Sequence, residues 1–146
     1  TFLFVTVSCI FVNSIMGSIS SQFGFELSIE IILGYIFAPI AWLMGIPWSE
    51  AVISGELLGI KTTLNEFVAY PALAALENGE LSERSKLITF YSLCGFANLS
   101  SVGILISGIT AMAPERKDDL INVSFKALVG ATLASCMTGL IVGIFI

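Results

Sequence analysis

The sequence contains no histidine in its 146 residues, which removes the commonest metal ligand and the commonest general base. The three cysteines lie within apolar stretches, and their odd number implies no disulfide framework. Only 12% of the residues are charged, and the six Lys and Arg residues form no basic stripe. We therefore expect no resident metal or organic cofactor and no nucleic-acid binding.

Apolar residues dominate what is present. They make up 56% of the chain, cluster in long runs and give a mean hydropathy of +0.97, which is typical of a membrane protein. The chain has no initiating Met, and it begins and ends in apolar runs. We therefore expect a piece of a longer protein, in which neither a signal peptide nor the full topology can be judged.

Residues 51–76 form the most informative stretch. They are apolar enough for a membrane, yet they include Glu56, Lys61, Asn65 and Glu66. An ionisable side chain near the centre of a bilayer costs roughly 2.5 to 3.5 kcal/mol, and Glu66 lies close to the middle of this segment. The placement of this carboxyl group therefore indicates a function.

The lengths of the apolar runs predict how this stretch is built. Residues 51–60 and 67–76 each form about ten residues of helix, about 15 Å long, which is half the hydrocarbon thickness. Residues 61–65 between them favour caps and turns. We predict a re-entrant helical hairpin over residues 50–77, with its tip at an interior site. Asn65 and Glu66 would lie there, at the N-terminus of the second half-helix.

A second interruption is predicted within residues 86–112, a run long enough to cross the bilayer. Its centre reads CGFANLSSVG over residues 94–103, where glycines flank polar residues that compete with helical hydrogen bonding. These residues predict a broken transmembrane helix with Asn98 in the break. Glycine and serine could instead allow close helix packing, but two interrupted segments in succession are typical of a transporter substrate site.

The other apolar runs are predicted as spans over residues 2–20, 29–46 and 120–146, with a kink at Pro39 in the second. Small residues in the first and last spans favour packing against other helices.

Charge gives a small preference for one orientation. Basic residues on one side of the membrane are Arg116, Lys117 and Lys126, and those on the other are Arg84 and Lys86. The positive-inside rule then favours a cytoplasmic loop at residues 113–119.

Two motifs carry a resemblance to a known family. Residues 59–70, GIKTTLNEFVAY, and residues 94–104, CGFANLSSVGI, resemble the two signature segments of the concentrative nucleoside transporters. Residues 37–48, FAPIAWLMGIPW, resemble the preceding span of that family. The resemblance covers nearly the whole chain. It implies an all-α transporter fragment, the C-terminal part of a homotrimeric multi-pass protein of the cell membrane. Such a protein imports nucleosides with a coupling cation by an elevator-like movement.

The resemblance also implies roles for single residues. By motif, Glu66, Asn98 and Ser101 contact the ribose of the nucleoside, sodium is the favoured coupling cation, and most of its site lies upstream of this chain. Leu99 stands where phenylalanine is common in the family, an apolar exchange that leaves these roles intact. The chemistry agrees, because a carboxylate accepts two hydroxyl hydrogen bonds, whereas an amide and a serine hydroxyl both donate and accept.

Three alternatives are left open at this point. Glu66 could take part in proton coupling in place of sodium, because burial disfavours an ionised carboxyl group. An intramembrane hydrolase would need a nucleophile and a base, but the chain has no His and no intramembrane Asp. A purely structural membrane subunit would bind no nucleoside. We therefore expect a transporter and not an enzyme.

Overall fold

The computed structural model describes residues 2–23, 28–77 and 79–146, and these ranges contain helices and no strand. The predicted all-α class is therefore confirmed. In chain order the helices are α1 (Phe2–Phe23), α2 (Ile29–Leu43), α3 (Trp48–Thr63), α4 (Glu66–Ala75), α5 (Glu83–Leu93), α6 (Leu99–Met112), the short 3-10 helix η1 (Pro114–Arg116) and α7 (Lys117–Phe145).

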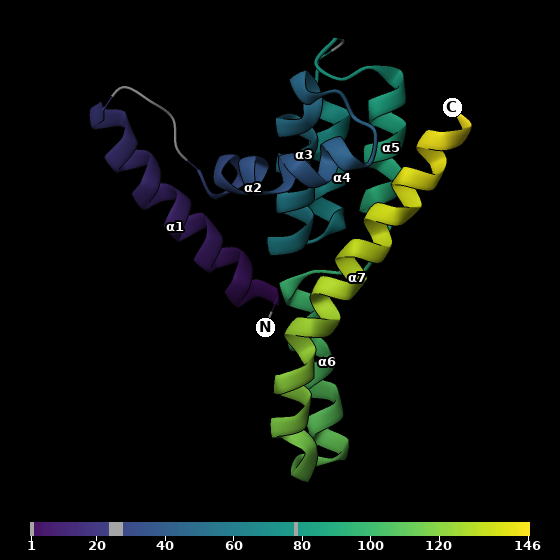
Figure 1. The fold of residues 1–146 in the computed structure, drawn as a ribbon. Coiled ribbons are helices and arrows are strands. Elements are labelled where there is room, and N and C mark those ends of the chain that lie inside the picture. Colours follow the sequence, from purple (N-terminus) through teal and green to yellow (C-terminus); the bar gives the residue numbers. More distant parts are fainter. Residues whose placement is uncertain (1, 24–27, 78) are drawn as a thin grey trace.

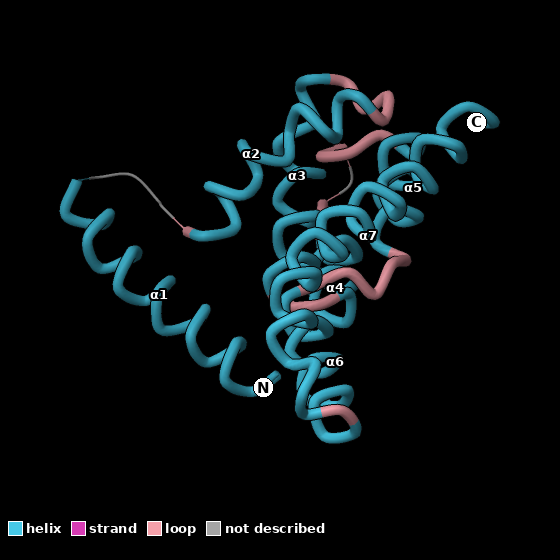
Figure 2. Tube along the Cα trace, turned by 60° about the horizontal axis from the view of Figure 1, so that its bottom comes forward, coloured by secondary structure: helices cyan, strands magenta, loops and turns pink. Residues whose placement is uncertain are grey.

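The helices form two groups that share α7 (Figure 1). One group contains α3, α4, α5 and the C-terminal part of α7, with α2 packed against α3. The other contains α6 and the N-terminal part of α7, which run side by side because η1 turns the chain back. Helix α1 lies apart from α3, α4 and α5 in both views and contacts the start of α2 and helix α6 (Figure 2).

One continuous helical stretch among the described residues, Pro114–Phe145, is by itself long and apolar enough to cross a membrane. It covers residues 120–145 of the span predicted for residues 120–146, and its helix α7 begins three residues before that span, at Lys117. Small residues bring this helix close to its neighbours. A methyl group added to Gly139 would lie 2.5 Å from the Ile88 carbonyl of α5, and one added to Gly143 would lie 2.9 Å from Ile88 Cδ1.

The predicted span over residues 29–46 differs from what the chain forms. Helix α2 has 15 residues, about 22 Å, which falls short of the roughly 30 Å hydrocarbon core. The chain then turns at Gly45, whose φ of 94° is easily adopted only by glycine, and α3 leaves at 119° to α2. This stretch is therefore a short helix followed by a sharp turn and not a straight span.

Polar contacts hold the start of α2 and the start of α5 to other parts of the chain. Asn13 of α1 donates to both carboxylate oxygens of Glu30 at 2.8 Å and accepts from the backbone N–H of Ile29 at 2.9 Å. Arg84 of α5 donates to the carbonyls of Gly45 and Gly143, each at 2.6 Å. The second contact ties the turn before α3 and the last turn of α7 to the start of α5.

Candidate functional site

The first break in the helices lies between α3 and α4, where the hairpin tip was predicted. It is shorter than the predicted tip of residues 61–65, because α3 continues through Lys61 to Thr63. The hydroxyls of Thr62 and Thr63 donate to carbonyls one turn earlier, at 2.7 and 2.8 Å, so both threonines are accommodated within the helix. Asn65 then caps α4, its side chain accepting from the N–H of Val68 at 3.1 Å.

The second break lies between α5, which ends at Leu93, and α6, which begins at Leu99. Asn98 is the N-cap of α6, and its side-chain oxygen accepts from the N–H of Ser101 at 2.7 Å. The Ser101 hydroxyl in turn accepts from the N–H of Asn98 at 3.2 Å. This reciprocal capping box satisfies two of the four N–H groups that a helix start leaves without partners.

The two breaks meet through the side chains that the sequence singled out. Asn98 Nδ2 donates to Glu66 Oε2 at 3.2 Å, although the two residues lie far apart in the sequence. Asn98 is 1% exposed, and Glu66 is partly buried in the first turn of α4. The structure therefore places a carboxylate, an amide and two helix N-termini at one point.

Ser101 lies at the same corner but is already engaged. It is buried, and its hydroxyl lies 2.7 Å from the carbonyl of Asn98 and 3.2 Å from that of Phe96, either of which can accept its proton. Of the three predicted residues, Glu66 and Asn98 are thus in direct contact, and Ser101 joins them through the cap of α6.

Lys61 is the residue whose place the sequence did not reveal. The sequence placed it in the polar connection of the predicted hairpin, yet its side chain is 0% exposed. Its ammonium Nζ donates to the carbonyl of Ser92, in the last turn of α5, at 2.8 Å. The available signal was a lysine directly after the apolar run of residues 51–60, because a cation at the C-terminal end of a helix is stabilised by the helix dipole.

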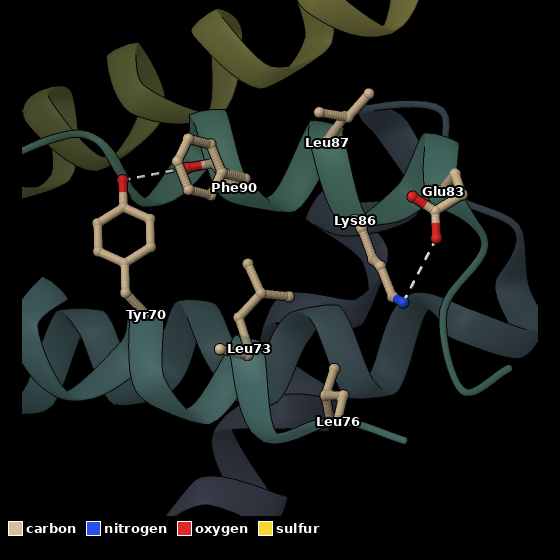
Figure 3. Close-up of a pocket in the computed structure, with 8 residues that line it drawn as sticks. Tyr70, Leu73, Leu76, Glu83, Lys86, Leu87 and Phe90 are labelled. Carbon is tan, nitrogen blue, oxygen red and sulfur yellow. Dashed lines mark hydrogen bonds and ion pairs between the residues drawn. The ribbon is translucent and has the colours of Figure 1, made fainter. Parts of the chain in front are cut away.

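A cavity of about 710 Å³ lies between α4 and α5 but does not include the polar pair. Tyr70 and Phe90 line it, and the ion pair of Lys86 with Glu83, 3.5 Å apart, closes one end (Figure 3). A smaller cavity of about 140 Å³ between α6 and α7 reaches Ser101. The described residues contain no group of three or more Cys, Asp or Glu side chains placed to hold a metal.

Two helical elements that break beside each other, with polar groups of both breaks in contact, define the class of this chain as a membrane transporter with discontinuous helices. A family model described as Na+ dependent nucleoside transporter C-terminus matches residues 1–143. The chain therefore belongs to the concentrative nucleoside transporter family.

Individual relatives agree with this family. Nucleoside permease NupC of Helicobacter pylori is 45% identical over 125 residues, 83% of this chain and 30% of that protein. Solute carrier family 28 member 3 of Mus musculus is 42% identical over 149 residues, 92% of this chain and 21% of that protein.

Solved structures of CNTnw have the same fold. A CNTnw variant in an intermediate state superposes with a TM-score of 0.91 at 40% identity, covering 99% of this chain and 37% of that one. CNTnw in an inward-facing substrate-bound state gives 0.85 at 39% identity, covering 98% and 36%. The chain thus spans between 21% and 37% of the length of these relatives.

Proposed function

We propose that the complete protein imports nucleosides across the cell membrane together with a cation, and that Glu66, Asn98 and Ser101 bind the ribose. The observation that carries this proposal is the hydrogen bond of 3.2 Å between Asn98 and Glu66, which joins the two breaks. The comparisons support the proposal because one similar protein is a nucleoside permease, and a similar solved structure, that of CNTnw, was obtained in a substrate-bound state.

The chemistry of the pair suits a neutral sugar with neighbouring hydroxyl groups. An ionised Glu66 only accepts hydrogen bonds, so it can take the protons of two hydroxyls. The Asn98 amide has a second N–H besides the one that it gives to Glu66, and Ser101 can exchange a carbonyl partner for a sugar oxygen. A ligand lacking these hydroxyls would leave buried partners unpaired, and selectivity for the sugar follows.

The transport step proposed here is an elevator-like movement of helices α2 to α7 against a scaffold that includes α1. The separation of α1 from the α3, α4 and α5 group is consistent with such a division. CNTnw is known in inward-facing, intermediate and outward-facing states, which is the behaviour that alternating access requires. A homotrimer surrounded by lipid in the cell membrane completes the proposal.

Sodium is the proposed coupling ion, since the family model is described as Na+ dependent. Proton coupling through Glu66 is the second candidate, because this carboxyl group lies at the meeting point of the breaks. A structural subunit without transport activity is the third.

Uptake of labelled uridine and adenosine into vesicles holding the complete protein separates these candidates. One series applies a sodium gradient at fixed pH, and the other applies a pH gradient without sodium. We expect accumulation in the sodium series only. Accumulation driven by the pH gradient alone would replace sodium with protons, and absence of uptake and of binding would leave the structural subunit.

A further inference from the structure

The two breaks bring four helix ends together, and these ends differ in polarity. At the hairpin tip, α3 ends and α4 begins; in the broken helix, α5 ends and α6 begins. The ends of α3 and α5 present carbonyl groups without helical partners and partial negative charge. The starts of α4 and α6 present free N–H groups and partial positive charge. Two carbonyl ends lying close together, those of α3 and α5, require a cation between them. Two N–H ends lying close together, those of α4 and α6, require an anion or another acceptor.

The chain supplies a suitable side chain at each pair. Glu66, in the first turn of α4, accepts from Asn98, the N-cap of α6. Lys61, in the last turn of α3, donates to the carbonyl of Ser92, in the last turn of α5. Glu66 and Asn98 are 32 residues apart in the sequence, and Lys61 and Ser92 are 31 apart. Both bonds therefore connect the hairpin to the broken helix: the Lys61 bond lies before the two breaks and the Glu66 bond after them.

The ammonium of Lys61 depends on this arrangement. A buried charge is costly unless it is paired or hydrogen-bonded, and Lys61 is the largest fully buried side chain of the described residues. The ion pairs found among the described residues are those of Lys86 with Glu83 and of Arg116 with Asp119, and neither includes Lys61. The Ser92 carbonyl at the C-terminal end of α5, 2.8 Å from Nζ, is therefore the hydrogen-bonding partner of Lys61, and the Glu66 carboxylate acts on the Lys61 charge at longer range.

Gly95 provides the space for this contact. A methyl group on Gly95 would lie 3.3 Å from Lys61 Nζ and would overlap the side chain of Ser135 in α7. Any larger residue at this position would therefore displace the ammonium or α7. Gly95 of the second motif, residues 94–104, thus leaves the space that Lys61 of the first motif, residues 59–70, occupies.

We propose that Lys61 is a positioning residue of the nucleoside site. By holding the carbonyl ends of α3 and α5 together, it fixes the separation of the starts of α4 and α6, and so of Glu66 from Asn98. Lys61 itself does not touch the nucleoside. This inference rests on the proposed ribose site, because its effect is measured through recognition of the sugar hydroxyls.

The test is binding of uridine and of 2′,3′-dideoxyuridine to the complete protein in nanodiscs, comparing the parent with Lys61→Met. Methionine retains the length of the side chain and removes its charge and donors. We expect uridine binding to weaken at least about tenfold, as for loss of hydrogen bonds to a charged group, and dideoxyuridine binding to change little. Lys86→Met is the matched control, because Lys86 pairs with exposed Glu83 outside the breaks, and it should leave both affinities unchanged.

A double-mutant cycle shows whether Lys61 acts through the pair. If it does, Lys61→Met should cost little further uridine affinity in a Glu66→Gln background. Additive losses, equal losses for the two ligands, or unchanged affinities would each overturn the inference. A parent protein that binds no uridine would instead refute the proposed function.

A second variant covers failure of Lys61→Met to fold. Gly95→Ala combined with Ser135→Gly retains the lysine, removes the overlap with Ser135 and leaves the new methyl group 3.3 Å from the ammonium. Ser135→Gly alone is its control. The methyl group requires the end of the Lys61 side chain to shift by a few tenths of an ångström, so we expect a smaller loss of uridine affinity than in Lys61→Met, again without a loss for dideoxyuridine. Unchanged uridine affinity in this variant, together with failure of Lys61→Met to fold, would identify a purely structural lysine and overturn the inference.

Discussion

Asn98 combines two roles that are usually given to different residues. Its side-chain oxygen accepts from Ser101 N–H and caps α6, while its amide nitrogen donates to Glu66. Because each role uses a different atom, substitutions can separate them. The helix start and the proposed sugar site therefore share one side chain.

We expect Asn98→Ser and Asn98→Ala to differ in stability but to agree in binding. Serine retains a capping oxygen, whereas alanine loses it at a cost of about 1 kcal/mol, so the alanine variant should unfold at the lower temperature. Both lack the amide N–H that Asn98 donates to Glu66, and both should bind uridine at least about tenfold more weakly. Thermal unfolding and calorimetric titration of the complete protein measure the two effects. Parental affinity in either variant would exclude the donor role.

Single residues were predictable where their chemistry conflicted with their surroundings. Glu66 stood out as a carboxyl group in an apolar segment, and Asn98 as a capping residue in the middle of a span. Lys61 stood out as a charged residue in the same segment, but its partner could not be predicted, because that partner is a backbone carbonyl 31 positions away. The engagement of the Ser101 hydroxyl was likewise hidden, since it depends on where α6 begins.

At the scale of elements, α7 approaches α5 closely along one face. Gly139 and Gly143 lie buried against Ile88 and Ser92, whereas a methyl group on Gly130 would meet no described atom within 4 Å. Small residues along this helix were predicted as a packing face. The structure assigns that role to the C-terminal part of the helix and leaves Gly130 exposed.

Gly139→Ala should destabilise the protein, although alanine favours helix. Its methyl group would overlap Ser92 and lie 2.5 Å from the Ile88 carbonyl, and overpacking of this kind costs about 1 to 3 kcal/mol. Gly130→Ala is the matched control and should be neutral, or more stable by up to about 1 kcal/mol. Thermal unfolding of the complete protein in nanodiscs compares them. Equal unfolding temperatures would show that α5 and α7 have room to separate.

The breaks were predictable from the sequence because polar and glycine residues interrupted apolar runs of measurable length. The length of each break was not, since threonines that favour turns can also bond back within a helix, as Thr62 and Thr63 do. Residues 29–46 are predicted as one span because they form a single apolar run, and an apolar run does not show where the chain turns. The turn at Gly45, with its positive φ, ends α2 after 15 residues.

At the scale of the whole molecule, this chain covers between 21% and 37% of the length of the relatives named above and holds two breaks that lie side by side in the proposed sugar site. Both carry groups suited to sugar hydroxyls. The cavity of about 710 Å³ lies beside α4 and α5 and away from these groups. We therefore expect the rest of the protein to enclose the nucleobase and the coupling ion.

The predicted orientation can be tested by labelling. We expect a cysteine replacing Glu115, next to the basic residues of η1 and α7, to react with a membrane-impermeant maleimide only from the cytoplasmic side. A cysteine replacing Glu80, in the exposed turn before α5, should react only from outside. A cysteine-free background of the complete protein is required, because native Cys94 is exposed. Labelling from the opposite sides would invert the topology.

The most direct measurement is calorimetric titration of uridine and 2′,3′-dideoxyuridine into the complete protein and its Glu66→Gln variant. Glutamine retains the shape of the side chain and loses the charge that accepts the ribose hydroxyls. The account predicts that uridine affinity falls at least about tenfold in the variant while dideoxyuridine affinity changes little. Unchanged uridine affinity, or equal losses for both ligands, would contradict a ribose site at the meeting point of the two breaks.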